Sequence, residues 1–184
     1  MNIIFMGTPA FAVPSLRILL NSHHKISAVV TVPDKPKGRG QHLAGSEVKN
    51  FAVEAGLNIL QPLSLKDPDF INELKDLAPD LIVVVAFRIL PKNIFKIPRF
   101  GSINLHASLL PKYRGAAPIN WAVINGERET GVTTFFLQEK VDTGNIIMQK
   151  SIDISGDDNA GTVHDKLMYT GAQVVFDTVD LIEN

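Results

Sequence analysis

Short apolar runs alternate with amphipathic segments along almost the whole chain. The apolar runs predict strands at 2–6, 25–32, 58–60, 81–86, 102–106, 131–138 and 145–154. Apolar residues that recur every three or four positions predict helices at 11–20, 47–55, 67–78 and 117–126, and a last helix that begins at a capping box over 162–165. Because strands and helices alternate, we expect an α/β fold with a mostly parallel sheet between two layers of helices.

The composition is that of a single soluble globular domain. The chain has 184 residues, of which 45% are hydrophobic and 20% are charged. No apolar stretch approaches the roughly 20 residues that cross a bilayer. The N-terminus lacks the basic segment of a signal peptide, so we expect a cytoplasmic protein without membrane contact. The absence of cysteine excludes disulfides and thiolate chemistry, and the five histidines show no metal-ligand spacing, so we expect no metal.

Charge is unevenly distributed, although the net charge is only −1. Residues 1–126 carry +6 and residues 127–184 carry −7. The stretch 81–126 has no acidic residue but contains Arg88, Lys92, Lys96, Arg99, Lys112 and Arg114. It is either a chance gap in acidic residues or a positive surface suited to an anionic substrate, such as a phosphate ester, a folate tail or nucleic acid.

The connection over 33–45 is too long for an ordinary strand-to-helix loop, which has about 2–6 residues. It contains three glycines, two prolines and the cationic residues Lys35, Lys37 and Arg39. The segment is either a solvated surface loop or a basic arm that becomes ordered on an anionic partner.

The strand expected at 102–106 carries the best candidate chemistry. Asn104 and His106 lie two positions apart, so both side chains point from the same face of the strand. An amide can stabilise a developing oxyanion and an imidazole can transfer protons, as acyl transfer requires. Asp142 lies between the last two expected strands, which should flank the same end of the sheet. Its carboxylate could orient His106 and favour the protonated ring.

Two other chemistries are not supported by the motifs. The turn after the first strand begins with Gly7 but lacks the second and third glycines of G-x-G-x-x-G, so NAD binding is not expected. Ser108 is not surrounded by a G-x-S-x-G elbow, and we interpret it as a turn residue with a hydroxyl or backbone contact rather than as a nucleophile.

The segment 104–118, together with Gly131-Val-Thr and Val141-Asp142-Thr-Gly144, resembles the 10-formyltetrahydrofolate-dependent formyltransferases. The resemblance implies a Rossmann-like three-layer fold with one reversed strand, and 10-formyltetrahydrofolate as co-substrate. It implies that Asn104, His106 and Asp142 are the catalytic residues. It also implies folate contacts from the turn residues Ser108, Leu109, Leu110 and Pro111, and from Val85, Ala86, Phe87, Arg88, Leu137 and Gln138 around the pterin.

Two features narrow the resemblance to one branch of the family. The opening Ile4-Phe-Met-Gly-Thr-Pro-Ala-Phe11 and the basic 33–40 loop are similar to those of members that formylate initiator methionyl-tRNA. That branch implies tRNA contacts from Lys35, Lys37 and Arg39. It further implies that 1–184 is the catalytic domain of a monomer whose second, β-barrel domain also holds tRNA. The alternatives are formyl transfer to a sugar nucleotide or glycinamide ribonucleotide, hydrolysis of the formyl folate, and a non-catalytic module that binds folate or nucleic acid.

Overall fold

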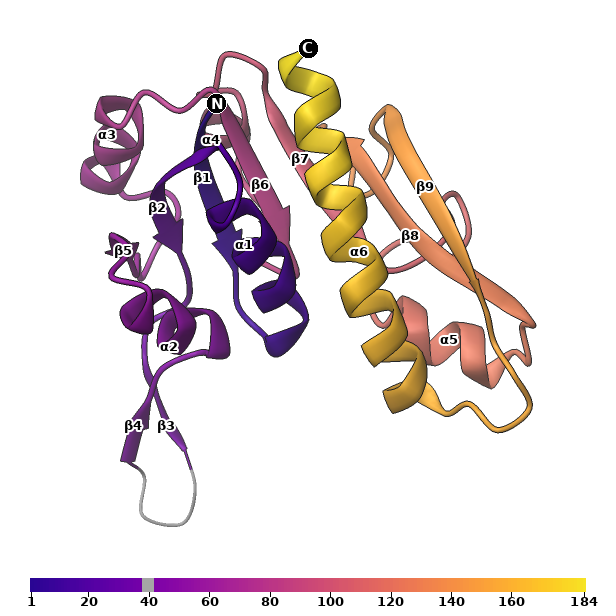
Figure 1. The fold of residues 1–184 in the computed structure, drawn as a ribbon. Coiled ribbons are helices and arrows are strands. Elements are labelled where there is room, and N and C mark those ends of the chain that lie inside the picture. Colours follow the sequence, from indigo (N-terminus) through magenta and orange to yellow (C-terminus); the bar gives the residue numbers. More distant parts are fainter. Residues whose placement is uncertain (38–41) are drawn as a thin grey trace.

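The computed structural model describes residues 1–37 and 42–184, and its centre is a seven-stranded sheet (Figure 1). The strand order is β5-β2-β1-β6-β7-β8-β9. The strands are β1 (Asn2–Gly7), β2 (Lys25–Val30), β5 (Ile59–Leu60), β6 (Leu81–Val85), β7 (Ser102–His106), β8 (Glu129–Phe136) and β9 (Ile146–Asp153). Of the seven strands, only β8 runs opposite to the other six, which confirms the expected mostly parallel sheet with one reversed strand.

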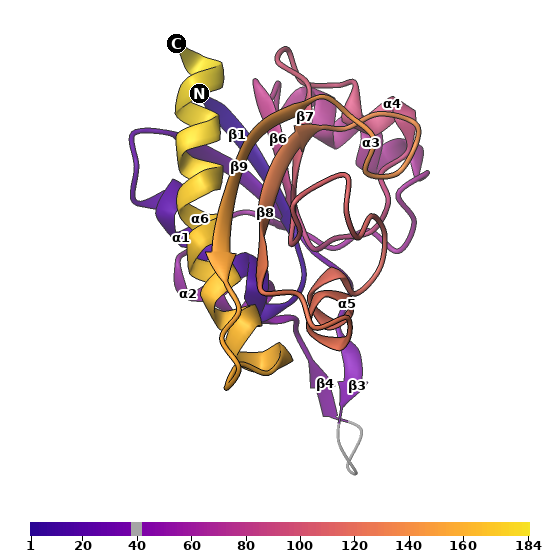
Figure 2. The same cartoon turned by 90° about the vertical axis from the view of Figure 1, so that its right-hand side faces the viewer.

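Helices cover both faces of the sheet and complete the expected three layers. One face packs against α1 (Val13–Leu20), α2 (Glu47–Glu54) and α6 (Ala160–Glu183), and the other against α3 (Pro68–Asp76) and α4 (Lys92–Phe95). The helix α5 (Pro118–Ile124) lies beside α6 (Figure 2), and a short 3₁₀ turn, η1 (Ala10–Ala12), precedes α1. None of the helices in the described residues is long and apolar enough to cross a membrane.

The central strand β6 shows why the sheet has two cores. All five of its residues are buried, as the unbroken apolar run predicted. Successive side chains point to opposite faces. Leu81, Val83 and Val85 therefore join the core under α1, α2 and α6, whereas Ile82 and Val84 join the core under α3 and α4.

The last helix starts three residues earlier than the sequence interpretation placed it. The N-cap is Asn159, whose side chain accepts hydrogen bonds from the amides of Gly161 and Thr162. Thr162 is the third helical residue, and its hydroxyl accepts a return bond from the Asn159 amide. The prediction that a capping box begins at Thr162 was therefore wrong, because an amide side chain upstream provides the cap and the threonine provides the reciprocal contact.

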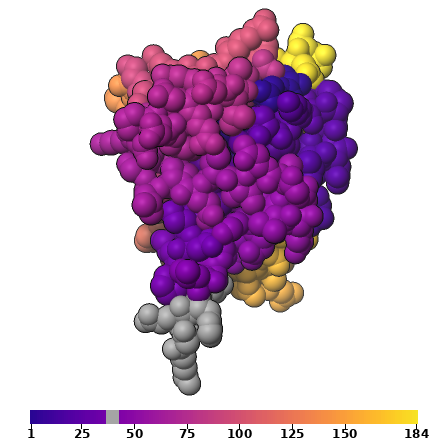
Figure 3. Space-filling view, turned by 90° about the vertical axis from the view of Figure 1, so that its left-hand side faces the viewer, coloured from indigo at the N-terminus to yellow at the C-terminus, as the bar shows by residue number. Residues whose placement is uncertain are grey.

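The described residues of the basic 33–45 segment include regular structure, which the solvated loop that we considered would lack. Residues 35–37 (β3, Lys35–Lys37) and 42–44 (β4, His42–Ala44) form an antiparallel hairpin that stands at one end of the molecule (Figures 1 and 3). At its base, Asp34 accepts hydrogen bonds from Lys49 at 2.5 Å and from Gln61 at 2.8 Å. Arg39 lies outside the described residues.

Candidate active site

A cavity of about 620 Å³ lies at the edge of the sheet where β6 and β7 end, and residues from the cores on both faces contribute to its lining. Its size is within the roughly 300–1,000 Å³ that small-molecule sites occupy. The walls come from the segment after β6, the end of β7, the loop before α5 and the loop after β8. Asn104, His106 and Asp142 all contribute to the lining, so the structure brings the three expected catalytic residues together.

The register of β7 places the amide and the imidazole side by side on the cavity face. Asn104 pairs with Val84 of β6, and both residues line the cavity. His106 follows two positions later, so its side chain points the same way. The intervening Leu105 points to the opposite core, under α6. The period-two argument from the sequence is thus confirmed at this strand.

The imidazole of His106 is held in one tautomer. Its Nε2 donates a hydrogen bond to the backbone carbonyl of Tyr113 at 2.8 Å. A carbonyl only accepts, so the proton of the neutral ring is on Nε2. Nδ1 then faces Asp142, 3.7 Å from Oδ2, and the two side chains are only 8% and 10% exposed.

Asp142 reaches His106 by a route that the sequence did not indicate. The end of β8, Phe136, pairs with Ile103 at the start of β7, so the β8–β9 loop leaves the sheet at the end remote from His106. The loop must therefore run back over the sheet face to bring Asp142 to the imidazole. The expectation that these two strands flank the end of the sheet where His106 lies was wrong, because β8 is the reversed strand.

The Asp-Thr-Gly sequence is what allows this return. Asp142 has a left-handed φ of 51°, a conformation that asparagine and aspartate tolerate better than most residues. A Cβ at Gly144 would lie 1.6 Å from the carbonyl oxygen of Phe136, so only glycine fits where the loop folds back on β8. Asp142 Oδ2 also accepts a hydrogen bond from the amide of Gly115 at 2.8 Å, which joins the two loops that form the cavity mouth.

Tyr113 is a residue at this site that the sequence analysis missed. Its backbone has φ of 56°, and its hydroxyl donates to Glu127 Oε1 at 2.7 Å and accepts from the Asn125 amide at 3.0 Å. Hydrogen bonds from Tyr113 and then Lys112 lower the pKa of Glu127, so this anchor is an ionised carboxylate. No side-chain motif reveals the role, since the contact with His106 is made by a backbone carbonyl.

The turn at 108–111 serves mainly to shape the end of β7. Ser108 donates to the carbonyl of Lys112 at 2.6 Å, which confirms its interpretation as a turn residue. Thr133 donates to the Ser108 carbonyl at 2.7 Å and accepts from the Leu110 amide at 3.1 Å, while Gln149 donates to the Leu110 carbonyl at 3.0 Å. In the described chain, none of Ser108, Leu109, Leu110 and Pro111 lines the cavity wall.

Most of the remaining residues expected around the pterin do line the cavity. Ala86, Phe87 and Arg88 form one wall, and Leu137 and Gln138 form another. Val85 does not take part, because its side chain is buried in the core on the opposite face.

Arg88 is partly withdrawn from solvent beside this wall. Its guanidinium donates to the carbonyls of Pro62 and Leu63 at 3.0 and 3.3 Å and lies 5.1 Å from the centre of the Phe87 ring. Burial lowers the pKa of Arg88. The side chain therefore pins the loop after β5 to the cavity wall.

The acid-free stretch is not a uniformly positive surface. Lys92 forms an ion pair with Glu139, and Lys112 forms one with Glu127 at 3.3 Å. Both acidic partners come from the negatively charged part of the chain, so folding neutralises some of the asymmetry seen in the sequence.

Two lining residues come from near the opposite ends of the chain. Phe11 and His164 meet edge to face, with ring centres 5.3 Å apart. Sequence reasoning did not single them out, because only the packing of η1 beside α6 brings them together.

The three-layer α/β fold matches that of solved formyltransferases. Over 97% of its length the chain is similar to a solved phosphoribosylglycinamide formyltransferase from Bacillus halodurans, with a TM-score of 0.81, 18% identity and 93% of that chain covered. It is also similar over 99% of its length to WlaRD, a sugar 3N-formyl transferase, with a TM-score of 0.72, 25% identity and 62% of that chain covered.

The chain belongs to the formyl transferase family, whose sequence model matches residues 1–179. It is 53% identical over its whole length to the methionyl-tRNA formyltransferase of Bacteroides thetaiotaomicron, of which it covers 57%. It is 56% identical over 99% of its length to the methionyl-tRNA formyltransferase of Parabacteroides distasonis, of which it covers 56%. The chain thus spans little more than half the length of these curated relatives.

Proposed function

We propose that the protein transfers the formyl group of 10-formyltetrahydrofolate to the α-amine of methionine carried by initiator tRNA. The observation that carries the proposal is the convergence of Asn104, His106 and Asp142 on one cavity. The names of the relatives that are 53% and 56% identical support methionyl-tRNA as the acceptor. The family itself supports a formyl group as the unit transferred.

The geometry suggests how the three side chains divide the reaction. The amine attacks the formyl carbon, and the new C–N bond forms as the carbonyl oxygen becomes an oxyanion. Asn104 donates a hydrogen bond to that oxygen. His106 passes a proton from the amine to the folate nitrogen through Nδ1, because Nε2 is occupied by the Tyr113 carbonyl. The carboxylate of Asp142 stabilises the positive charge on the imidazole while the C–N bond to folate breaks.

The placement of the basic hairpin supports a nucleic-acid acceptor. The hairpin of β3 and β4 follows the carboxyl end of β2, so it stands at the same end of the sheet as the cavity. Lys35, Lys37 and Arg39 would contact the phosphates of the tRNA acceptor end while its methionine enters the cavity. We further propose that residues 1–184 are the catalytic domain and that the longer protein holds the rest of the tRNA elsewhere.

The test is to follow a labelled formyl group from 10-formyltetrahydrofolate to methionyl-tRNA. We expect label on methionine, and we expect its loss in His106→Ala. Asn104→Ala should lower kcat by about 10²–10³ while leaving folate affinity nearly unchanged. The exposed Asn72→Ala on α3 is the matched control and should retain full activity.

Other distributions of the label identify the alternatives. Label released only as formate would indicate hydrolysis. Label on a sugar nucleotide or glycinamide ribonucleotide would show that this molecule, and not methionyl-tRNA, is the acceptor. Folate binding with no turnover would favour a non-catalytic module. If Asn104→Ala lowered folate affinity and kcat by equal factors, Asn104 would not be the residue that stabilises the oxyanion.

A further inference from the structure

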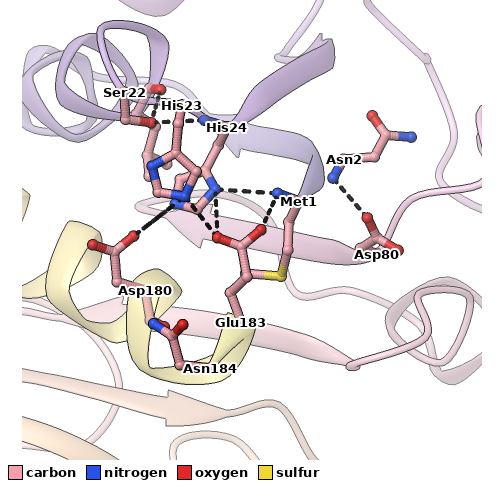
Figure 4. Close-up of polar contacts among 10 residues, drawn as sticks. Met1, Asn2, Ser22, His23, His24, Asp80, Asp180, Glu183 and Asn184 are labelled. Carbon is pink, nitrogen blue, oxygen red and sulfur yellow. Dashed lines mark hydrogen bonds and ion pairs between the residues drawn. The ribbon is translucent and has the colours of Figure 1, made fainter.

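A second group of ligand-type side chains lies at the end of the sheet opposite the cavity. His23 and His24 lie in the turn between α1 and β2, and Asp180 and Glu183 lie in the last turn of α6 (Figure 4). One nitrogen or oxygen atom from each of the four residues lies within 4.8 Å of all the others. The proposed formyl transfer uses none of these side chains.

The distances are close to those of a shared metal ion. His24 Nε2 lies 3.0 Å from Asp180 Oδ1, and His23 Nε2 lies 2.7 Å from Glu183 Oε2 and 4.0 Å from Asp180 Oδ1. Nitrogen and oxygen ligands held about 2.0–2.2 Å from a tetrahedral Zn²⁺ lie roughly 3.3 Å from one another. Small side-chain movements would therefore bring all four atoms around one ion.

The surroundings favour a cation. Asp180 and Glu183 are three positions apart, on one side of a helix end, where the helix dipole is negative. The carboxylate of Glu183 accepts hydrogen bonds from the Met1 ammonium and from His23. The buried ammonium contacts Oε1 of Glu183 at 2.6 Å and Nδ1 of His24 at 3.2 Å, so it already lies on one side of the cluster, whereas Oε2 of Glu183 faces the imidazoles.

The two imidazoles are poorly suited to being charged at the same time. Their ring centres are 4.0 Å apart, so two positive charges would repel each other. The His24 side chain is fully buried, where a charged ring would be poorly solvated, and a metal ligand must be a neutral ring. A shared ion would join the two neutral rings to the two carboxylates without this repulsion.

We propose that His23, His24, Asp180 and Glu183 bind one divalent ion of the zinc type and so join the α1–β2 turn to the end of α6. His23 Nε2 and His24 Nε2 carry the ring protons in the arrangement observed, because the carboxylates that they contact only accept. When the ion binds these nitrogens, each ring keeps one proton by moving it to Nδ1 and stays neutral. The Met1 ammonium beside His24 Nδ1 then loses one proton to solvent and accepts the new Nδ1–H bond. Two imidazoles suit Zn²⁺ better than Mg²⁺, which prefers oxygen ligands and its own waters.

This site departs from the expectation of no metal and is independent of the proposed formyl transfer. The histidine spacing could not reveal it, since Asp180 lies 156 positions from His24 and only the fold brings the two together. Because the site is at the far end of the sheet from the cavity, its role is to fix α6 rather than to take part in the chemistry.

The experiment measures zinc binding and thermal unfolding of the EDTA-treated chain. We expect calorimetric titration with ZnCl₂ to show one saturable site, and Tm to rise by roughly 5–10 °C at about 100 times Kd. MgCl₂ at the same concentration should cause no comparable rise. The Zn²⁺-dependent rise in Tm should be lost in Asp180→Asn/Glu183→Gln and strongly reduced in His23→Asn.

Each variant is compared with itself with and without zinc, so a loss of basal stability does not obscure the result. The matched control is Glu73→Gln/Asp76→Asn, an exposed carboxylate pair at the same spacing on α3, which should keep the full zinc response. No saturable binding to the wild-type chain, or the same zinc response in the Asp180/Glu183 variant as in the wild type, would overturn the proposal.

Discussion

At the scale of single residues, the site depends on a backbone atom as much as on side chains. The carbonyl of Tyr113 fixes the proton of His106 on Nε2 and so decides that Nδ1 faces Asp142. That carbonyl is held in place because the Tyr113 ring is anchored to Glu127 and Asn125. In the proposed formyl transfer, Tyr113 would therefore be a positioning residue that acts through the orientation of the imidazole.

Tyr113→Phe should separate positioning from binding. The variant keeps the ring but loses both hydrogen bonds of the hydroxyl, so the carbonyl that holds His106 becomes less well fixed. We expect kcat to fall by roughly tenfold, since displacements of about 1 Å can cost up to 10² in rate. KM for 10-formyltetrahydrofolate should stay within about twofold, because Tyr113 is not part of the cavity wall.

Steady-state kinetics with each substrate varied in turn would check this split. A parallel rise in KM for the folate would show that the loop shapes the binding site itself, and an unchanged kcat would show that the anchor is dispensable. The exposed Tyr169→Phe on α6 is the matched control and should leave both constants unchanged.

Residue patterns predicted which side chains come together better than the path of the chain that brings them together. Asn104 and His106 could be paired from the sequence because the strand period of two is reliable over five residues. The path that brings Asp142 to His106 could not be predicted, since it depends on the direction of β8. The role of Tyr113 was hidden because side-chain identity carries no information about a carbonyl contact.

At the scale of elements, α6 is secured at its first turn by a small polar network. Asp158 accepts hydrogen bonds from the backbone and hydroxyl of Ser155, from the Thr162 hydroxyl at 2.8 Å, and from Lys166 at 2.5 Å. These contacts, led by that from Lys166, lower the pKa of Asp158. A negative side chain also suits the positive end of the helix dipole.

Asp158→Asn should lower Tm in a pH-dependent way. Folding lowers the pKa of this carboxyl from its unfolded value of 3.8, so the ionised side chain stabilises the folded protein fully above that pH. The stabilisation is lost progressively as the pH falls from the unfolded pKa toward the pKa of the folded protein. We expect Tm at pH 7 to fall by roughly 2–4 °C, the size typical of a lost cap. The difference from wild type should shrink progressively below about pH 4.

Thermal unfolding from pH 7 to pH 3 would measure this trend, with the exposed neighbour Asp157→Asn as the control. A difference between Asp158→Asn and wild type that stayed constant over this range would show that the stabilisation is not electrostatic.

Long, strongly patterned elements were predictable, and short ones were not. The five-residue apolar run of β6 and the helices with Ser46 or Asp67 as N-caps were expected near where they occur. The hairpin of β3 and β4 and the four-residue helix α4 were not predicted. Their sequences are too short to show a period, and tertiary contacts decide their conformation.

At the scale of the whole molecule, the two ends of the sheet have different tasks. The carboxyl ends of β6 and β7 hold the cavity, and the basic hairpin stands at the same end. The other end gathers the first residues of β1, the turn after α1 and the last turn of α6 (Figure 4). Changes at one end should therefore leave the function of the other largely intact.

Removing the charges of the hairpin should test this separation. In Lys35→Ala/Lys37→Ala/Arg39→Ala we expect KM for methionyl-tRNA to rise at least about tenfold, and the salt dependence of tRNA use to become shallower, because fewer counterions are released. Formate release from the folate without tRNA should be unchanged. The triple variant Lys25→Ala/Lys66→Ala/Lys75→Ala removes three exposed charges elsewhere and should behave as wild type.

Measuring tRNA kinetics at several salt concentrations distinguishes the outcomes. If the hairpin variant and the control had the same KM for methionyl-tRNA and the same salt dependence, the hairpin would have no part in tRNA recognition. A loss of folate-dependent formate release would show that the hairpin supports the cavity instead.

The packing of α6 beside α1 has a consequence for how the chain is made. The apolar side of α1, near the N-terminus, is completed by a helix that is synthesised only after residue 159. During vectorial synthesis the first helix therefore remains without its main partner until most of the sheet has left the ribosome. Such long-range pairing gives a high contact order, which slows folding and leaves apolar surface open to chaperones. Cavity residues as distant as Phe11 and His164 can meet only after that step.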